Sequence, residues 1–353
     1  MSKYWNENVK GIEPYVPGEQ PKDKKYIKLN TNENPYPPSP KVIEAISKAV
    51  NGDLRLYPDP TCSDLINKIA DYYNVDNHEV FIGNGSDEIL AFIFMTYFEK
   101  GKKVLFPDIS YTFYKVYAEL FKLDYNMVKL DDEFNIPLDE FKKKNGGVIL
   151  PNPNAPTGKY INVYELEDVV KANEDSVVVI DEAYVDFGGE SMIPFTKKYK
   201  NLLVVQTLSK SRALAGLRVG FAIGNKELIE GLNRVKNSMN SYTIDRIALA
   251  GAKAAIEDDE YFRKITKSII ETRQKYIVKI KELGFRVLDS KANFIFVKHN
   301  QLEGKYLYQQ LKEKGVLVRY FDKERIEDYL RITIGTNEEM EVLIEKIKEI
   351  INN

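Results

Sequence analysis

Apolar and polar positions form alternating blocks along the first two thirds of this chain. Short apolar runs rich in valine, isoleucine and phenylalanine are typical of strands buried on both faces. Such runs occupy residues 79–83, 103–107, 124–130, 146–151, 176–184 and 201–208. Between them, longer segments predict helices at residues 86–98, 110–121, 138–144 and 163–173. This alternation predicts an α/β domain with a mainly parallel central sheet over residues 33–241.

The pattern changes from about residue 258 onward. A long helical segment ends at Gly284, a typical helix stop. Strand-like runs at residues 285–290, 293–298, 316–321 and 329–335 then mix with helical segments at residues 304–315 and 337–351. We therefore expect a smaller α+β domain over residues 242–353. The proline-rich residues 1–32 predict an irregular arm.

Composition narrows the classes of function. A chain of 353 residues predicts two domains, or one large domain with a smaller satellite. Its net charge of -2 gives no electrostatic reason to bind nucleic acid or an anionic membrane. No apolar run reaches the length of a membrane span, and the first residues lack the apolar core of a secretory signal. We expect a cytoplasmic enzyme, although a binding protein also fits these bounds.

Cysteine and histidine are scarce. The chain has one cysteine and two histidines, which excludes an intramolecular disulfide and argues against a zinc site. With so few of these residues, a catalytic mechanism that pairs a histidine with a serine or cysteine nucleophile is disfavoured. We read both His78 and His299 as solvated residues of polar turns, and Cys62 as a residue at the start of a helix.

Four unusual segments follow predicted strands. They are GNGSDE, NPNAPTG, DEAYVDF and SKSRALAGLR, beginning at residues 83, 152, 181 and 209. In parallel α/β sheets, ligands bind beyond the carboxyl ends of the strands. We expect these four segments to gather at one edge of the sheet and to form a binding site there.

The residue types in these segments indicate a binding site for an anion and a reactive lysine amine. Glycines before the helix that starts near Ser86 let backbone N–H groups approach a phosphate, although a capped helix alone would explain them. Asp181 ends an apolar strand, so its carboxylate needs a partner, either an arginine or a protonated heterocyclic nitrogen. Lys210 lies among small neutral residues, where its amine suits a Schiff base, and Ser209 and Arg218 nearby suit a phosphate. The alternative for Lys210 is a side chain that extends to solvent.

The sequence resembles a known family along most of its length. The matching segments are LNTNENPYPP, RLYPDP, GNGSDE, NPNAPTG, DEAYVDF, TLSKSRALAGLRVGF, KANFIFV and LRITIGT, in this order from residue 29 to residue 336. In them the chain resembles the fold-type I, class II aminotransferases that depend on pyridoxal 5'-phosphate (PLP), and among these the histidinol-phosphate aminotransferases. The resemblance implies a fold-type I transferase with a mainly parallel sheet and a smaller α+β domain.

The resemblance implies roles around the cofactor ring. Lys210 would hold PLP as a Schiff base, and Asp181 would pair with the ring nitrogen and keep it protonated. Tyr184 would hydrogen-bond the phenolic oxygen of the ring. The family usually has asparagine directly before PTG, but this chain has Ala155 there. Asn154 takes over this contact, or Tyr184 makes it alone.

The resemblance also implies a phosphate cradle. The cofactor phosphate would lie on the backbone of Ser86 and Asp87, with the side chains of Ser209 and Arg218 around it. Tyr111 would stack on the ring, and its alternative role is packing in an aromatic-rich core.

Substrate and subunit contacts follow from the same resemblance. Arg331 would receive an acidic substrate group and Arg319 the phosphate of histidinol phosphate, while Tyr15 and Asn32 would close over the substrate. Tyr57 would reach the cofactor phosphate of a neighbouring subunit, so the resemblance implies a homodimer with a shared active site. The alternatives are an exposed arginine at Arg319 and a tyrosine packed against prolines at Tyr57.

The implied reaction belongs to histidine biosynthesis and is a ping-pong transamination. Histidinol phosphate and 2-oxoglutarate would give imidazole-acetol phosphate and glutamate, with Lys210 moving the proton. Decarboxylation of threonine phosphate in cobalamin synthesis and transamination of aromatic amino acids fit the same scaffold. A PLP-binding regulator usually carries a DNA-binding segment, and none is visible. A dehydrogenase is disfavoured because the G-x-G-x-x-G pattern is absent.

Overall fold

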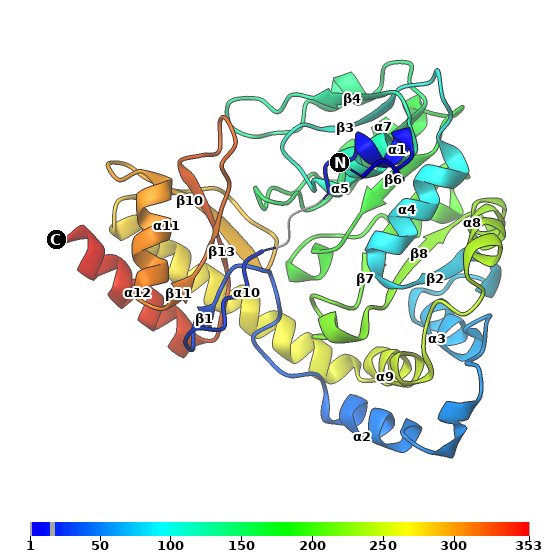
Figure 1. Ribbon diagram of the computed structural model, residues 1–353, viewed down its shortest axis with the longest axis horizontal. Coiled ribbons are helices and arrows are strands. Elements are labelled where there is room, and N and C mark those ends of the chain that lie inside the picture. Colours follow the sequence, from blue (N-terminus) through cyan, green and yellow to red (C-terminus); the bar gives the residue numbers. More distant parts are fainter. Residues whose placement is uncertain (1, 15–17, 353) are drawn as a thin grey trace.

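The computed structural model describes residues 2–14 and 18–352 of the chain. It has a large α/β unit and a smaller unit, and the long helix α10 (Asp259–Glu282) runs between them (Figure 1). Over the described residues, none of the helices combines the length and the apolar character needed to cross a membrane.

A seven-stranded sheet forms the centre of the large unit. Its strands follow the order β2-β8-β7-β6-β5-β3-β4. They are β2 (Val80–Gly83), β3 (Val104–Pro107), β4 (Tyr125–Val128), β5 (Gly147–Pro151), β6 (Val178–Asp181), β7 (Leu202–Thr207) and β8 (Gly220–Gly224). Only β8 is antiparallel to its neighbours, β2 and β7. The predicted mainly parallel α/β sheet is therefore confirmed.

Helices cover both faces of this sheet, because successive side chains of each buried strand point to opposite sides. On one face, Ile180 and Val204 pack with residues of α3 (Ser63–Tyr73), α7 (Val163–Ala172) and α9 (Arg246–Glu257). On the other face, Val179 and Val205 pack with residues of α4 (Gly85–Tyr97), α5 (Phe113–Leu120) and α8 (Lys226–Met239). The result is a three-layer α/β arrangement.

The smaller unit has its own sheet and its own core. Its four strands follow the order β12-β13-β10-β9 and pair in antiparallel fashion. They are β9 (Phe285–Val287), β10 (Phe294–His299), β12 (Arg319–Tyr320) and β13 (Tyr329–Thr333). Leucine and isoleucine side chains of α11 (Gly304–Glu313) and α12 (Asn337–Ile351) fill the core against these strands and α10.

Short elements tie the units together. Strand β1 (Ile27–Lys28) pairs in parallel with β11 (Val316–Leu317) of the smaller unit. Helix α2 (Pro40–Ala49) packs on α9. The remaining helical turns are α1 (Glu7–Lys10), α6 (Leu138–Phe141) and the 3-10 turns 52–55, 77–79, 185–187, 193–197 and 215–217. The end of the predicted arm thus contributes a strand, and α9 shares the core of the large sheet.

Candidate active site

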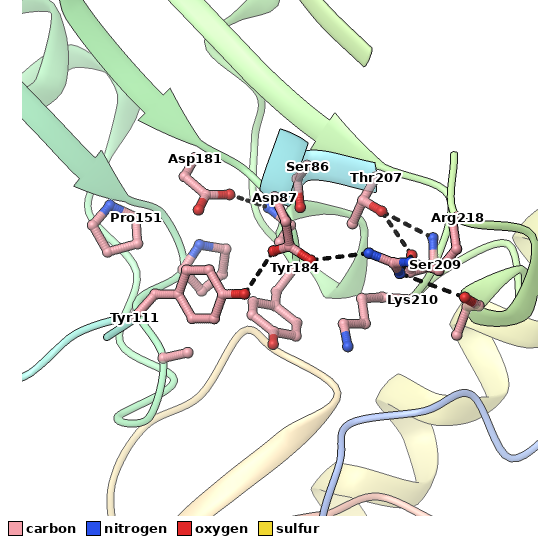
Figure 2. Close-up of a pocket in the computed structure, with 14 residues that line it drawn as sticks. Ser86, Asp87, Tyr111, Pro151, Asp181, Tyr184, Thr207, Ser209, Lys210 and Arg218 are labelled. Atoms are coloured by element: carbon pink, nitrogen blue, oxygen red, sulfur yellow. Dashed lines mark hydrogen bonds and ion pairs between the residues drawn. The ribbon is translucent and has the colours of Figure 1, made fainter. Parts of the chain in front are cut away.

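The carboxyl ends of the central strands enclose a cavity of about 130 Å³. In the pairing register Gly83, Gly220 and Thr207 stand side by side on β2, β8 and β7, so the ends of these strands meet at one edge. Asp181 ends β6 beside them, and the first turn of α4 forms another wall (Figure 2). We call this space the inner cavity. All four unusual sequence segments contribute to its lining, as the sequence predicted.

The first turn of α4 and Arg218 form a cradle for an anion. Asn84 precedes this helix without a side-chain capping bond, so the N–H groups of its first turn remain for a ligand. The Arg218 guanidinium donates to the Asp87 carboxylate at 2.9 Å and to Ser209 Oγ at 3.4 Å. Tyr111 also donates to Asp87, at 2.6 Å, and Figure 2 shows these side chains joined in one chain of hydrogen bonds.

Two glycines make this close approach possible. Gly85 has a φ of 77°, and a Cβ there would lie 2.5 Å from a nitrogen of Arg218. A Cβ on Gly220 would lie 2.7 Å from the backbone nitrogen of Ser86. Any larger residue at either position would therefore push the arginine or the helix start out of place.

Asp181 presents a buried carboxylate to the inner cavity. Its side chain is only 5% exposed and accepts hydrogen bonds from Tyr114 Oη at 2.6 Å and from the Ala183 N–H at 3.2 Å. Burial raises the pKa of Asp181 to about 6, although both hydrogen bonds act in the opposite direction. Within residues 2–14 and 18–352 no basic side chain forms an ion pair with it. A bound cation would supply the missing partner.

Lys210 lies where the inner cavity meets a wider one. The wider space, of about 510 Å³, is called here the outer cavity, and both cavities share Tyr111, Ala155, Tyr184 and Lys210 in their linings. Lys210 Nζ lies 5.9 Å from the centre of the Tyr184 ring and 3.4 Å from the Thr31 carbonyl. Its amine can therefore reach a group bound in either cavity.

Two arginines from neighbouring strands line the outer cavity. Arg319 on β12 pairs in register with Arg331 on β13, so both side chains leave the sheet on the same side. The Arg331 guanidinium lies 5.4 Å from the Phe294 ring and 5.6 Å from the Phe321 ring, and the Arg319 guanidinium lies 5.5 Å from the Phe321 ring. This wall suits an anionic ligand with two binding points.

The inner cavity fits the groups of PLP. The carboxylate of Asp181 suits a protonated ring nitrogen, and the glycine-lined start of α4 suits a phosphate. A lysine amine stands between them and the outer cavity. These donors reach the cavity because the missing side chains of Gly85 and Gly220 let Arg218 and the start of α4 pack closely beside it.

Comparison with known proteins decides the family. The model of the family "Aminotransferase class I and II" matches residues 24–347. This chain belongs to the class I and II aminotransferases. The family match confirms the enzyme class predicted from the sequence, a PLP-dependent aminotransferase.

Individual relatives agree with this assignment. The chain is 70% identical to the histidinol-phosphate aminotransferase of Clostridium beijerinckii, covering all of this chain and 99% of that protein. It is 59% identical to the enzyme of the same name from Clostridium acetobutylicum, over 99% of this chain and all of that protein. A structure of histidinol-phosphate aminotransferase from Sinorhizobium meliloti in complex with pyridoxal-5'-phosphate has the same fold. Its TM-score is 0.90 at 24% identity, and the match covers 100% of this chain and 98% of that one.

Most predicted site residues of this aminotransferase lie in the two cavities. The inner cavity is lined by Ser86, Asp87, Tyr111, Asp181, Tyr184, Ser209, Lys210 and Arg218. The outer cavity is lined by Asn32, Arg319 and Arg331, besides the shared residues. Asn32 Nδ2 donates to Tyr184 Oη at 3.0 Å, so the arm segment is bonded to the cofactor side of the site.

Asn154 and Ala155 are adjacent in the sequence, but only Ala155 borders the cavities. Ala155 lines both cavities, whereas Asn154 is buried outside these linings. The Asn154 amide donates to the Ile109 carbonyl at 3.0 Å and to Thr157 Oγ1 at 3.1 Å. This arrangement favours the second sequence alternative, in which Tyr184 alone serves the ring oxygen.

The structure places neither Tyr57 nor Tyr15 at the site. Tyr57 is 77% exposed, stacks on Tyr242 at 4.6 Å between ring centres and belongs to neither cavity lining. Tyr15 lies outside the described residues. The roles proposed for both therefore remain predictions.

The prediction that His299 is solvated was wrong. His299 is buried, and its Nδ1 accepts the backbone N–H groups of Gln301 and Leu302 at 3.1 and 3.0 Å. Its polar neighbours in sequence suggested a solvated turn, but the ring instead closes that turn. Cys62 does stand at the start of helix α3, as predicted.

Sequence reasoning missed Tyr114, the side chain that contacts Asp181. It lies three residues after Tyr111, in the first turn of helix α5, and the two rings meet edge-on with their centres 5.7 Å apart. That spacing was the available signal, but the many aromatic residues nearby concealed it.

Proposed function

We propose that this aminotransferase exchanges the amino group between histidinol phosphate and 2-oxoglutarate, giving imidazole-acetol phosphate and glutamate. The observation that carries the proposal is the pair Arg319 and Arg331 on the wall of the cavity that opens onto Lys210. Two adjacent guanidinium groups suit a phosphate in one half-reaction and a carboxylate in the other. The printed names of the relatives at 70% and 59% identity support the same substrate.

The inner cavity would hold PLP by three kinds of contact. The start of α4, Ser209 and Arg218 would take the phosphate, Asp181 would face the ring nitrogen, and Tyr111 would cover the ring. When bound, PLP supplies an aromatic system that accepts the electron pair left when a proton leaves the substrate carbon. The ionised carboxylate of Asp181 favours this by keeping positive charge on the ring nitrogen.

Lys210 has the position of a proton carrier. Its amine stands at the shared wall of the two cavities. There it can take a proton from the substrate carbon that bears the amino group and transfer it to a carbon of the cofactor. The Thr31 carbonyl, 3.4 Å from Nζ, gives the amine a resting contact. Arg319 and Arg331 fix the far end of the substrate, so the reacting carbon stays close to Lys210.

A homodimer is part of this proposal, as is a cytoplasmic location. Tyr57 and Tyr242 stack on each other and are exposed, as are Leu54 and Leu56 close to Tyr57 in the sequence, and we call these four residues the Tyr57 patch. Exposed apolar groups of this kind mark subunit contacts. Tyr57 would then serve the cofactor phosphate of the neighbouring subunit.

A donor panel tests the substrate. Purified protein with PLP and 2-oxoglutarate would be given histidinol phosphate, phenylalanine, tyrosine or threonine phosphate, with glutamate and carbon dioxide measured separately. We expect the highest kcat/KM with histidinol phosphate and no carbon dioxide. A higher value with an aromatic amino acid, or carbon dioxide from threonine phosphate, would replace this proposal by the corresponding alternative.

A further inference from the structure

We propose that the hydroxyl group of Tyr114 is a positioning group that aims the Asp181 carboxylate at the ring nitrogen of the cofactor. The inference deepens the proposed function, since it rests on PLP in the inner cavity. It assigns a role to a residue that lines neither cavity and acts only through Asp181.

Geometry is the first support. Tyr114 is fully buried, and its Oη donates to Asp181 Oδ2 at 2.6 Å. The Ala183 N–H donates to the other oxygen, Oδ1, at 3.2 Å. One donor on each oxygen fixes the rotation of the carboxylate, and each oxygen keeps a lone pair for a further donor. A ring N–H in the inner cavity would be that donor.

The Tyr114 ring is itself held in place. It packs against Phe106 with ring centres 6.0 Å apart and edge-on against Tyr111 at 5.7 Å. Tyr111 in turn donates to Asp87 in the wall of the same cavity. The segment that leads into α5 and the first turn of that helix therefore carry both the tyrosine that lines the cavity and the tyrosine that contacts Asp181.

Electrostatics gives the hydroxyl a second effect. Burial, the nearby Asp181 charge and the hydrogen bond to it raise the pKa of Tyr114 well above its usual range, so its hydroxyl remains a donor. Burial raises the pKa of Asp181 and the charge of Asp87 adds to this, while the bonds from Tyr114 and Ala183 lower it. Tyr111 and Tyr184 are the other titratable groups that act on Tyr114. Removing the hydroxyl would leave Asp181 less ionised near neutral pH and a weaker partner for a protonated nitrogen.

A double-mutant cycle on the full chain tests this. The dissociation constant of PLP would be measured by absorbance titration, without amino substrate, for wild type, Tyr114→Phe, Asp181→Asn and the double variant. We expect Tyr114→Phe to weaken binding about tenfold in the wild-type background, the size of a hydrogen bond to a charged group. With asparagine at position 181 it should change binding less than about twofold, because the charge to be aimed is gone.

A matched control separates positioning from general packing. Tyr97→Phe also removes a hydroxyl from a tyrosine, one that is partly buried at the last residue of α4 and donates to the Leu228 carbonyl of α8. It should leave PLP binding unchanged in both backgrounds. An equal loss from Tyr114→Phe in both backgrounds, or no loss in either, would overturn the inference.

Steady-state kinetics adds a second readout. With saturating PLP, Tyr114→Phe should lower kcat about tenfold and leave KM within about twofold, since the hydroxyl does not touch substrate. A change confined to KM would contradict the role. If the wild-type protein binds no PLP, the cofactor assignment itself fails. If the donor panel instead identifies an amino donor other than histidinol phosphate, the result of the double-mutant cycle on PLP binding is unaffected.

Discussion

Asp181 and Glu182 are adjacent residues that are both buried, yet they meet different surroundings. Asp181 borders the inner cavity, whereas Glu182 accepts hydrogen bonds from Met192 N–H, Ser191 Oγ and Gln206 Nε2 at 2.6 to 2.8 Å. Its carboxylate is thus enclosed by donors of the protein. At the residue scale, Asp181 is therefore the carboxylate available to a ligand, whereas Glu182 holds the segment 191–192 against β7.

The first prediction concerns the pH dependence of stability through Glu182. Burial raises its pKa from 4.5 to about 7, so folding favours its protonated form. Its contribution to stability is therefore present below pH 4.5 and is lost as pH rises through 7. For Glu182→Gln, the free energy of unfolding relative to wild type should rise by about 2 kcal/mol between pH 5 and pH 8.

Urea unfolding at several pH values would measure this difference. The exposed Glu227→Gln on helix α8 is a suitable control and should show no such trend. A relative stability of Glu182→Gln that stays constant or falls with pH would contradict the account.

A second prediction separates the two arginines of the outer cavity. Arg319→Gln should lower kcat/KM for histidinol phosphate about a hundredfold and affect glutamate less, because this guanidinium is assigned to the phosphate. Arg331→Gln should lower kcat/KM for both donors. Initial rates of the two half-reactions measure this, with Arg263→Gln on the exposed face of α10 as control. Equal losses for both donors in Arg319→Gln would refute the assignment of the phosphate.

At the scale of elements, the contact between β8 and the start of α4 shapes the anion cradle. Gly220 lies opposite Gly83 of β2 and Thr207 of β7, and its missing side chain lets the backbone of Gly85 and Ser86 approach. The position of the helix start therefore depends on a strand that supplies no polar side chain to the cavity. This contact links the packing of the sheet to the binding of phosphate.

The third prediction concerns this glycine. Gly220→Ala places a Cβ 2.7 Å from two backbone atoms that cannot rotate away, so it should destabilise the fold by about 1–3 kcal/mol and weaken PLP binding at least about tenfold. Gly216→Ala is the matched control, because nothing lies within 4 Å of its added Cβ. Thermal unfolding and absorbance titration measure both effects. Unchanged PLP affinity in a folded Gly220→Ala would show that the contact does not shape the cradle.

The sequence predicted the parallel strands and the polar segments after them, because buried strands have a strong local apolar pattern. It did not predict β8, a five-residue strand with a glycine at each end. That strand is held by pairing with β2 and β7, whose positions no local pattern reveals. The same holds for β1, which has two residues and forms only by pairing with β11. Tyr114 was missed for a related reason, since its role depends on a partner far along the chain.

At the scale of the whole molecule, the two units meet where the chemistry is placed. The large unit supplies Asp181 and Lys210, the smaller unit supplies Arg319 and Arg331, and the N-terminal region supplies Asn32. In the proposed function, both units contact the substrate and the large unit holds the cofactor. The cofactor residues lie in several recognisable segments of the large unit, so the sequence identified the family. The predicted substrate residues are single side chains of the smaller unit and the N-terminal region, so the sequence supported them less strongly.

A fourth prediction concerns assembly. Sedimentation should give twice the chain mass of 40.7 kDa, and Leu56→Asp in the Tyr57 patch should shift the protein toward the monomer and lower activity. Val278→Asp, at a residue on α10 that is 57% exposed, is the control and should change neither mass nor activity. A wild-type monomer with full activity would exclude the shared site.

Lys210 lies at the junction of the two cavities, and trapping the cofactor with borohydride shows whether its amine is the one that binds PLP. The purified protein would be incubated with PLP, reduced with borohydride, digested and mapped by mass spectrometry. We predict a pyridoxyl group on the peptide that contains Lys210, and no labelled peptide from Lys210→Ala. Labelling of another lysine, or transamination retained by Lys210→Ala, would contradict the account.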